Sequence, residues 1–573
     1  MTDFEIVDLV FSQEALENWV RSDLLAENWP VVYTLSNSKE IYVGETINTK
    51  ARMHQHLAST GKNGLTRTMV VMNRRFNKSA CLDLESSLIQ LFAADKNYKV
   101  LNANAGIVEA DYFERGSYKE SFTELFDVLV KRGMLSQSVP ELINSNLFKY
   151  SPFKALTDEQ ATAVSGILDQ ILRARRSERS SQIVIDGDPG TGKTIVAIYL
   201  MKLIVDIANM TTDNLIDDDS YFAEYMNAKN QELLDGFTVG LVIPQQSLRT
   251  TLERVFAKTP GLNKKMIVKP FSVGSSINKW DLLIVDEAHR LSVRANQAFP
   301  TLNTMYVDIN KKLFGRDDTK FTQLDWIETQ SQHQVLLVDP AQSIKPADLP
   351  RSAVNALISR AKEAGLYFKL TSQLRVSAEN DYVGYIQHLF SEHPIRNPGF
   401  GEYEFKLFDS LVEMRTEIIR KNDQVGLSRL LAGYAWKWVS KHKPNEPDIR
   451  IEGLDLYWNR TDKDWINSET SIAEVGSIHT VQGYDLNFAG VIIGRDIRFD
   501  PIQHKIVFSR ENYFDSKGIL NNRQLGISYS DEDILTWVLN IYRVLLTRGI
   551  KGTYIYICDD QLREHLKKYI ELH

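Results

Sequence analysis

The most constraining feature of this sequence is the run GDPGTGKT, which directly follows the apolar residues 183–185. A strand that leads into the pattern GxxxxGK[ST] predicts a loop whose backbone N–H groups surround a phosphate. Lys193 is expected to reach the β- and γ-phosphate oxygens, and Thr194 to hold Mg²⁺. The predicted nucleotide-binding loop consists of Gly187, Asp188, Pro189, Gly190, Thr191, Gly192, Lys193 and Thr194.

A second motif indicates that the bound nucleotide is hydrolysed. The run LLIVDEAHR at residues 282–290 predicts a buried strand that ends in two adjacent carboxylates. Asp286 is placed to hold Mg²⁺ through water, and Glu287 to orient or deprotonate the water that attacks the γ-phosphate. ATP and Mg²⁺ are therefore the expected cofactors.

Length and composition narrow the class of protein. A chain of 573 residues predicts several domains. Its contents of 43% hydrophobic and 25% charged residues are ordinary for soluble globular proteins, and no apolar run approaches the length of a membrane span. The amino terminus lacks the order of a secretory signal, and two cysteines are too few for a disulfide framework. A cytoplasmic location without a membrane partner is expected.

The charges are unevenly distributed along the chain. The net charge of −7 argues only weakly against a nucleic-acid partner. Residues 30–106 contain ten Lys or Arg and five Asp or Glu, so this segment is +5 and the rest of the chain is −12. A basic segment on an acidic chain is typical of contact with a polyanion. A solvated basic face is the alternative, and charge alone leaves both interpretations open.

The pattern of apolar residues predicts three parts in residues 1–150. Residues 1–29 show apolar positions near helical spacing, and residues 30–110 form a compact unit. That unit opens with the strands VVYTL and IYVGE, which the polar turn SNSKE joins as a hairpin. A helix at 49–59, a strand at 68–72 and a helix at 82–94 follow. Residues 111–150 are expected to be a helical connector.

From residue 151 strands and helices alternate, which predicts parallel sheets with crossover helices. The strands are too many for one nucleotide-binding sheet, so we expect two lobes, at residues 151–345 and 346–573. The expected fold class is α/β, a small α+β domain followed by these two lobes. The strand candidates lie at residues 183–185, 239–243, 282–285, 335–338, 453–457, 489–493 and 553–557.

Six short runs occur in the order found in the superfamily 1 helicase core, which residues 150–573 resemble. The runs are LTDEQ at 156–160, LVIPQQSLR at 241–249, LLVDPAQSI at 336–344, LTSQLR at 370–375, HTVQGYD at 479–485 and YRVLLTRG at 542–549. The sequences of these runs are most similar to those of the Schlafen-type helicase-like group, whose ATPase has two RecA-like lobes.

The resemblance implies roles for five further residues. Gln160 would recognise the adenine edge, and Gln342 would sense the γ-phosphate. Arg375 would face the nucleotide, and Gly483 would belong to the nucleotide-binding set. Arg548 would be the finger that stabilises the charge on the γ-phosphoryl oxygens in the transition state, an effect of roughly 10³-fold or more.

Two departures from unwinding enzymes limit what the resemblance implies. The run at 336–344 continues as IKPADLP and lacks the aromatic residue that such helicases stack on a base. The distances between motifs also leave little room for large accessory subdomains. ATP hydrolysis is expected, whereas translocation along nucleic acid and duplex unwinding stay open.

The N-terminal unit carries a second set of motif residues. VVY at 31–33, YVG at 42–44, Arg52 and His56 have the spacing of a GIY-YIG endonuclease, which the unit resembles. The resemblance implies that Tyr33, Tyr42, Arg52 and His56 form the active site, and that Glu85 binds the metal. Asn102 matches the late asparagine of the family. The sequence departs from the family in VVY for GIY and in Glu45, which stands where some members carry a cation.

The chemistry of phosphodiester cleavage explains these residue types. A single carboxylate such as Glu85 suits Mg²⁺, which keeps most of its waters. Arg52 can clamp two phosphate oxygens as negative charge develops. Tyr42 would be the general base or would position the water, with Tyr33 and His56 assisting. Because a free tyrosine has a pKa near 10, only about 0.1% is phenolate at pH 7, so nearby cations must lower that pKa.

The sequence as a whole predicts an ATP- and Mg²⁺-dependent endonuclease, a GIY-YIG domain joined to a helicase-like ATPase. DNA is favoured over RNA as its partner, and the resemblance implies a bacterial protein, in defence against foreign DNA or in repair. Two alternatives stay open: an ATP-gated sensor or scaffold that grips nucleic acid without cutting it, and an RNA-directed nuclease. A scaffold needs cations but no metal ligand, so Glu85 argues against it.

Overall fold

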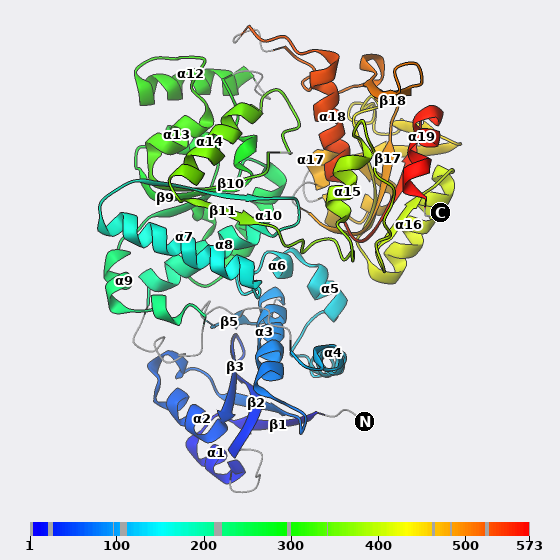
Figure 1. Cartoon of the computed structure of the whole chain (residues 1–573). Helices are drawn as coiled ribbons and strands as arrows, with labels where there is room; N and C mark the ends of the chain where they lie inside the picture. Colours follow the sequence, from blue (N-terminus) through cyan, green and yellow to red (C-terminus); the bar gives the residue numbers. More distant parts are fainter. Residues whose placement is uncertain are drawn as a thin grey trace. The chain divides into compact units, whose positions relative to one another are not determined.

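The computed structural model describes residues 4–20, 27–95, 97–102, 112–210, 221–294, 300–340, 342–460, 465–481, 484–521 and 526–571. Figure 1 shows the elements of the chain, with colours that follow the sequence. Internal contacts divide the chain into two compact units, each described by itself below. The first unit consists of Met1–Ser181, Thr194–Leu241 and Leu252–Ile267. The second unit consists of Gln182–Lys193, Val242–Thr251 and Val268–His573.

The first unit begins with a mainly antiparallel sheet of strand order β1-β4-β2-β3-β5. The predicted hairpin is confirmed, because Tyr33 of β2 lies opposite Gly44 of β3. Only β5 runs parallel to its neighbour, β3, within this described sheet. The strands are β1 (Glu5–Val10), β2 (Glu27–Ser36), β3 (Glu40–Asn48), β4 (Arg67–Met72) and β5 (Lys99–Val100).

The expectation that residues 1–29 are helical is wrong. Residues Glu5–Val10 form β1, which pairs antiparallel with β4, and only α1 (Gln13–Val20) is helical within the described part of this segment. The run EIVDLV can form a strand because it hydrogen-bonds to the open edge of β4, and a tertiary partner of this kind overrides helical spacing. The segment therefore belongs to the sheet domain.

Alternate residues of the sheet enter two separate cores. Val32, Val43 and Val71 pack against α3 (Lys78–Ala94). Tyr33 and Tyr42 lie in the other core with residues of α1 and α2 (Thr49–Ala58). This separation follows from the two-residue period of a strand, and it places both tyrosines on the face that α2 covers.

The remaining helices of the first unit include three in the predicted connector and one that begins at the end of the nucleotide-binding loop. Within the described ranges, no helix combines the length and apolar character needed to cross a bilayer. The helices are α4 (Arg115–Lys131), α5 (Val139–Asn144), α6 (Asn146–Lys149), α7 (Asp158–Arg176), α8 (Lys193–Ala208) and α9 (Ala228–Leu233), with α10 (Gln246–Lys258) divided between the units.

The first lobe of the ATPase is built on a sheet of strand order β11-β6-β10-β9-β7-β8. Strand β11 pairs in parallel with β6, and β10 in parallel with β9, as the alternating pattern predicted. Its strands are β6 (Ser181–Gly187), β7 (Val239–Val242), β8 (Ile267–Val268), β9 (Trp280–Val285), β10 (Ser331–Val338) and β11 (Tyr367–Leu370). The helices after β8 are α11 (Pro270–Ser275), α12 (Pro300–Phe314), α13 (Gln323–Gln330) and α14 (Arg351–Glu363).

This strand order moves the predicted boundary between the lobes. Residues 346–370 were assigned to the second lobe, but β11 pairs with β6 in the first lobe, so α14 and β11 belong to the first sheet. The sequence signal was weak because YFKL is a short edge strand with two half-buried residues and one exposed residue. The first sheet therefore ends at Leu370.

The second lobe has a sheet of order β12-β20-β17-β13-β16-β15-β14, in which β14 is antiparallel to β15. The sequence predicted β15, β17 and β20 and missed the shorter strands. Its strands are β12 (Glu404–Leu407), β13 (Ser428–Ala432), β14 (Ile449–Ile451), β15 (Leu454–Trp458), β16 (Glu474–Gly476), β17 (Leu486–Ile493) and β20 (Gly549–Ile557), with a separate hairpin of β18 (Ile497–Asp500) and β19 (Lys505–Phe508).

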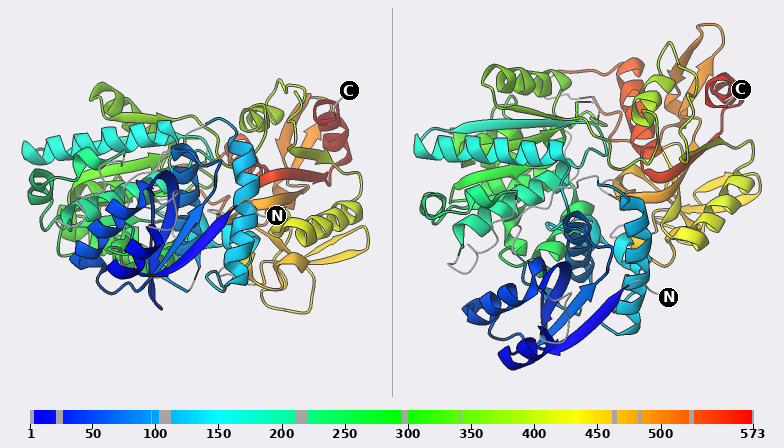
Figure 2. Two further views of the ribbon diagram at one scale, coloured as in Figure 1. Left: turned by 90° about the horizontal axis from the view of Figure 1, so that it is seen from below. Right: turned by 60° about the horizontal axis from the view of Figure 1, so that its bottom comes forward.

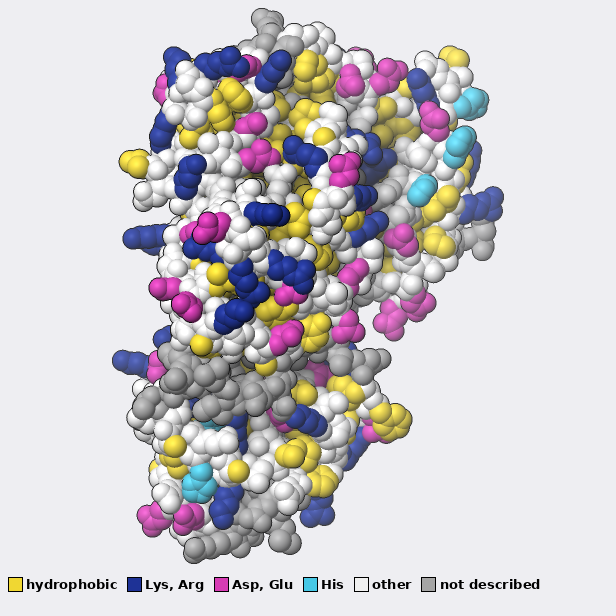
Figure 3. Space-filling model, turned by 60° about the vertical axis from the view of Figure 1, so that its left-hand side comes forward, with side chains coloured by type: hydrophobic (Ala, Val, Ile, Leu, Met, Phe, Trp, Pro, Cys, Tyr) yellow, Lys and Arg dark blue, Asp and Glu magenta, His cyan; other side chains and the backbone are white. Residues whose placement is uncertain are grey.

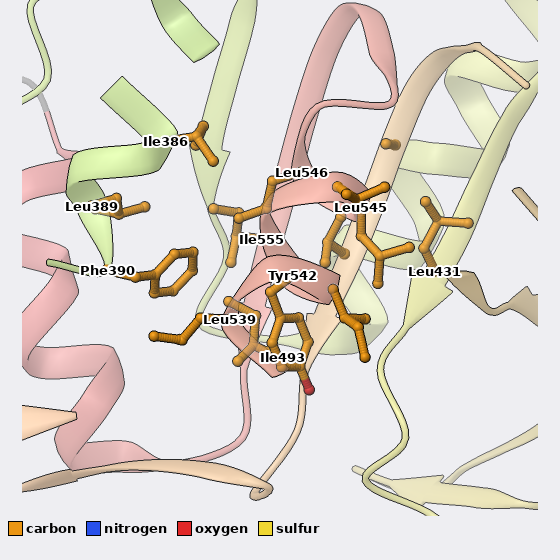
Figure 4. Packing of buried hydrophobic residues seen from close by; sticks show 14 of the residues in the cluster. Ile386, Leu389, Phe390, Leu431, Ile493, Leu539, Tyr542, Leu545, Leu546 and Ile555 are labelled. Atoms are coloured by element: carbon orange, nitrogen blue, oxygen red, sulfur yellow. The ribbon is translucent and has the colours of Figure 1, made fainter. Parts of the chain in front are cut away.

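Helices cover both faces of this second sheet, as the views in Figure 2 show. On one face, Ile493 and Ile555 pack against Leu546 of α18 (Figure 4). On the other face, Tyr554 packs with Ile418 of α16. The helices are α15 (Tyr382–Leu389), α16 (Leu411–Val425), α17 (Ile478–Val481), α18 (Asp531–Leu546) and α19 (Asp560–Ile570). The α/β fold class with two parallel-sheet lobes is confirmed.

A fully buried carboxyl group lies at the end of β17 in the second lobe. Asp496 follows β17, has no exposed surface and accepts a 2.6 Å hydrogen bond from the Tyr542 hydroxyl. Burial raises the pKa of Asp496 to about 7, although the hydrogen bond opposes that shift. The native protein therefore holds a proton that the unfolded chain releases near pH 4, so stability falls as the pH rises from about 4 to about 7.

Asp496→Asn is expected to remove this pH dependence, because the amide oxygen can still accept from Tyr542 and carries no charge. The free energy of unfolding of the variant should exceed that of the wild type increasingly from pH 5 to pH 7, by up to about 4 kcal/mol. Urea unfolding of the second lobe at several pH values measures the difference. Equal slopes with pH in both proteins would contradict a neutral buried Asp496.

Candidate active sites

The sheet domain brings four of the predicted nuclease residues together. Tyr33 and Tyr42 lie on adjacent strands with ring centroids 6.3 Å apart. The Tyr33 hydroxyl lies 2.7 Å from Nε2 of His56, and Arg52 Nε donates to the same hydroxyl at 3.4 Å. Arg52 and His56 share one face of α2 because they are four residues apart. The predicted cluster of Tyr33, Tyr42, Arg52 and His56 therefore forms.

Local sequence signals fix the start of α2 and with it the position of Arg52. The Asn48 side chain accepts from the Ala51 N–H at 3.0 Å, which caps the helix. Asn102 performs a similar task for β3, since its amide donates to Val43 O at 2.7 Å and accepts from Val43 N at 3.1 Å. The late asparagine thus braces the strand that carries Tyr42.

Gly44 is required by the position of Tyr33. A Cβ atom on Gly44 would overlap the hydroxyl and the ring of Tyr33, which lies directly opposite on β2. The glycine of the YVG run therefore makes room for the tyrosine of the VVY run. This explains in steric terms why the two motifs occur as a pair.

His56 is electrically neutral in this cluster. Burial, together with the charges of Lys62 and Arg52, lowers the pKa of His56 to about 2. Lys62 Nζ lies 2.8 Å from Nδ1 of His56 and 3.5 Å from the centroid of the Tyr42 ring. Sequence analysis did not single out Lys62, because it comes from a short 3₁₀ turn after α2 and matches no motif.

Glu85 lies on α3 with surroundings that fit a hard divalent cation. Glu45 and Glu85 both raise the pKa of the Cys81 thiol, after burial, so the two carboxylates lie near the same buried side chain. Glu45 also faces Lys78 Nζ at 3.8 Å. Within the described residues no group of three or more metal-ligating side chains occurs. Glu85 would offer Mg²⁺ one carboxylate, and the ion would keep most of its waters.

The phosphate loop follows β6 in the second unit. Gly190 and Gly192 have φ values of +91° and +80°, which side chains disfavour. A Cβ on Gly187 would lie 2.7 Å from Thr191 Oγ1. Lys193 Nζ donates to the carbonyl of Asp188 at 3.1 Å and to that of Gly187, so the loop wraps around the ammonium.

The second carboxylate motif is confirmed as the end of strand β9. Asp286 is buried, and Glu287 has a left-handed backbone with φ of +50°. Oε2 of Glu287 lies 2.9 Å from Nε2 of His289. Burial alone would raise the pKa of Glu287, but His289, Arg290 and Lys193 hold it below its usual range. The carboxylate is therefore ionised, as a water-orienting group requires.

The run after β10 is tied to this motif. Asp339 N donates to Nδ1 of His289 at 3.1 Å, and Gln342 Nε2 donates to Oδ2 of Asp339 at 2.6 Å. Asp339 also faces Lys193 Nζ at 3.8 Å. Gln342 is thus held next to the residues around Lys193. Sequence analysis missed Asp339 and His289, although both stand in motifs that it quoted.

The two predicted arginines make contacts inside the second unit. Arg375 forms an ion pair with Asp485. Arg548 is buried, and its guanidinium donates to the carbonyls of Val544 at 3.0 Å and Tyr484 at 3.3 Å. None of these bonds reaches the phosphate loop, and the finger role of Arg548 stays a prediction.

Three predicted residues remain. Gln160 is buried at the start of α7, where its Oε1 accepts from the Thr157 N–H at 3.2 Å. Thr194 lies in the first turn of α8. Gly483 lies outside the described residues. The nucleotide roles of all three stay predictions.

A groove of about 480 Å³, lined by polar and apolar side chains, opens in the second unit. Gln245 lines it, and its amide is buried with no hydrogen-bond partner among the described residues. Trp438 forms part of the wall, and Lys441 Nζ lies 4.9 Å from its ring centroid. Lys345 also lines the groove. Hydroxyls, amides, cations and an aromatic ring are the groups that bind single-stranded nucleic acid.

Two family models match the chain. The model described as Schlafen group 3, DNA/RNA helicase domain covers residues 180–559, which is more than half of the sequence. The chain belongs to this family. The model of the GIY-YIG catalytic domain covers residues 30–99, the sheet domain that holds Tyr33 and Tyr42. The protein is therefore a hydrolase that joins a GIY-YIG nuclease domain to a superfamily 1 helicase-like ATPase domain, and such domains use nucleic acid, nucleotide and divalent metal.

Two individual proteins are similar to this Schlafen group 3 chain. The uncharacterized protein YPL245W of Saccharomyces cerevisiae is 24% identical over 429 residues, which are 67% of this chain and 84% of that protein. A solved structure entitled "Structural Basis for DNA Unwinding at Forked dsDNA by two coordinating Pif1 helicases" is 10% identical and covers 70% of this chain and 91% of that chain. Its TM-score of 0.25 is too low to carry an argument.

Gly44→Ala is expected to reduce nucleic-acid cleavage by at least about 100-fold, because the new methyl group displaces the Tyr33 hydroxyl from His56 and Arg52. ATP hydrolysis, measured on the same preparation, should not change. Gly64→Ala is the control, since its Cβ would meet only Asn37 Nδ2 at 3.8 Å. Cleavage by Gly44→Ala at the rate of Gly64→Ala would show that the position of Tyr33 does not matter.

Proposed function

We propose that the protein is an ATP- and Mg²⁺-dependent endonuclease that acts on DNA, and that its ATPase controls when or where the GIY-YIG domain cuts. The observation that carries the proposal is the polar cluster around Tyr33. The hydroxyl of this buried tyrosine contacts both His56 and Arg52. A core tyrosine needs one partner, so two cationic or ring nitrogen donors at one oxygen are typical of a catalytic site.

The metal dependence rests on Glu85. Mg²⁺ bound there would supply a Lewis acid against the phosphate oxygens. Arg52 would hold the same phosphate while negative charge develops on it. A domain that only grips nucleic acid needs cations but no metal ligand, so Glu85 disfavours the scaffold alternative.

The groove in the second unit supports a nucleic-acid partner for the ATPase. Trp438 offers the ring that the run after β10 lacks, and base stacking on such a ring contributes about 1–3 kcal/mol. Lys345 and Lys441 are placed to meet phosphates. On the described part of the face in Figure 3, Lys and Arg are interspersed with Asp and Glu. The groove is the contact that we propose for the ATPase.

The preference for DNA rests on the nuclease family, which mostly cleaves DNA. For the biological role we propose the removal of foreign DNA, which a cutter under the control of a nucleic-acid-dependent ATPase can perform. Transformation of cells by unmodified plasmid, with wild type and with Glu85→Gln, tests this role. Equal transformation efficiencies would contradict it.

Two substitutions separate the activities. Glu85→Gln is expected to lower Mg²⁺-dependent cleavage by about 100-fold or more, since the metal loses its protein carboxylate, and to leave ATP hydrolysis intact. Lys193→Ala should abolish ATP hydrolysis and, with it, ATP-stimulated cleavage. Cleavage of plasmid and of single strands, with and without ATP, measures both effects.

The exposed residues Glu124 and Lys264 provide matched controls as Glu124→Gln and Lys264→Ala. If Glu85→Gln cuts as well as Glu124→Gln, the nuclease assignment is wrong. If Lys193→Ala loses ATP turnover but cuts at the wild-type rate with ATP present, the two activities are only tethered.

The groove makes a separate prediction. In a Glu85→Gln background, Trp438→Ala should weaken binding of single strands by about 1–3 kcal/mol. Lys441→Ala should reduce the slope of log K against log salt concentration by about 0.7. Fluorescence anisotropy with DNA and RNA of one sequence measures both and tests the preference for DNA. Lys443→Ala is the control, because Lys443 pairs with Glu446 at 2.8 Å outside the groove. Unchanged binding in both groove variants would remove the groove from the nucleic-acid interface.

A further inference from the structure

Lys62 is a cation of the nuclease cluster that matches no motif. It lies on the 3₁₀ turn Thr60–Lys62, after α2. Its Nζ lies 2.8 Å from Nδ1 of His56, whose side chain is only 4% exposed. On the other edge of the same ring, Nε2 lies 2.7 Å from the Tyr33 hydroxyl. His56 is thus bridged between an ammonium group and a phenol.

The chemistry of these groups leaves one arrangement of protons. An ammonium group has three N–H donors and no lone pair, so Nδ1 of His56 must be the acceptor of the bond from Lys62. A neutral imidazole carries one N–H, and the low pKa of His56 keeps the ring neutral. That N–H is therefore on Nε2, and it points to the oxygen of Tyr33.

We propose that Lys62 is a positioning residue that fixes His56 in the Nε2–H form, so that His56 donates to the hydroxyl oxygen of Tyr33. This inference rests on the proposed nuclease function of the same cluster. With Nδ1 covered by Lys62 and Nε2 protonated, His56 can donate a hydrogen bond but cannot take a proton from water.

The fixed tautomer defines the state of Tyr33. Its oxygen accepts from Nε2 of His56 and from Nε of Arg52. Two N–H donors stabilise negative charge on that oxygen, whereas the opposite tautomer would place a lone pair against it. The Lys62 ammonium, 3.5 Å from the Tyr42 ring centroid, favours negative charge on the second tyrosine as well. Lys62 therefore sets the charge preference of both tyrosines without binding substrate.

The tautomer is tested directly by ¹⁵N NMR of the full chain labelled at histidine. His56→Gln identifies the His56 signals by their loss. The wild type should show a bare, hydrogen-bonded Nδ1 and a protonated Nε2. Lys62→Met should shift the population toward the Nδ1–H form. A wild-type ring protonated at Nδ1, or a tautomer that Lys62→Met leaves unchanged, would overturn the proposal.

Kinetics distinguish positioning from phosphate binding. Lys62→Met should lower the single-turnover cleavage rate at saturating DNA by about 10- to 100-fold, with little change in the dissociation constant of DNA. Lys62→Arg, which keeps the charge and the donors, should restore most of the rate. Lys50→Met is the control, because Lys50 is exposed on α2. A larger dissociation constant of DNA with an unchanged cleavage rate would make Lys62 a phosphate contact instead and refute the proposal.

The two measurements also separate this inference from the proposed nuclease function. If the wild type cleaves no nucleic acid but Lys62→Met changes the tautomer, the nuclease function fails and the role of Lys62 in positioning His56 holds. If the wild type cleaves and the tautomer does not respond to Lys62→Met, the role of Lys62 fails alone.

Discussion

Burial of the central strands on both faces is the constraint on which the ATPase depends. In the first lobe, the last four residues of β9 and the last six of β10 are buried, so both faces of the sheet are covered. A sheet of this kind exposes polar backbone only at the ends of its strands. The phosphate loop follows β6, the carboxylate pair follows β9, and Asp339 follows β10. These chemical groups lie at the strand ends because apolar packing covers the faces of the sheet.

In the sheet domain, burial constrains the polar side chains, whose hydrogen bonds must be made inside the core. Its tyrosines point into an apolar core, where an unpaired hydroxyl would cost about 1–3 kcal/mol. His56 and Arg52 satisfy the Tyr33 oxygen, and Gly44 leaves room for its ring. Desolvation also keeps His56 neutral, so the cluster gains a fixed donor where an exposed histidine would titrate. Packing and chemistry therefore select the same residues.

Sequence analysis predicted those features that depend on local spacing. The phosphate loop, the hairpin with Tyr33 and Tyr42, and the (i, i+4) pair Arg52 and His56 were all correct in position, because each is fixed by neighbours in the chain. It failed where a distant partner decides. The strand Glu5–Val10 forms only against β4, and β11 joins the first sheet only through β6.

The site residues that sequence analysis missed share this dependence on distant partners. Lys62 contacts His56 from a turn with no recognisable motif. His289 meets Asp339 across fifty positions of sequence, and the bond between their atoms gives no periodic signal. Individual residues of this kind become visible only when the fold places them, whereas motif spacing can be read directly. The separate roles of the tyrosines and His56 could therefore be assigned only from the structure.

Strand β11 and the residues after it are hydrogen-bonded to the phosphate loop. Leu370 pairs with Gly187, and the chain then continues along the loop, where Gln373 donates to the Pro189 carbonyl at 2.7 Å and Leu374 N to the Gly190 carbonyl at 2.9 Å. The same stretch leads on to Arg375 and the second lobe. Any displacement of the second lobe that strains this stretch pulls on the carbonyls of the loop itself. The segment that links the lobes therefore couples a displacement of the second lobe to the geometry of the phosphate loop.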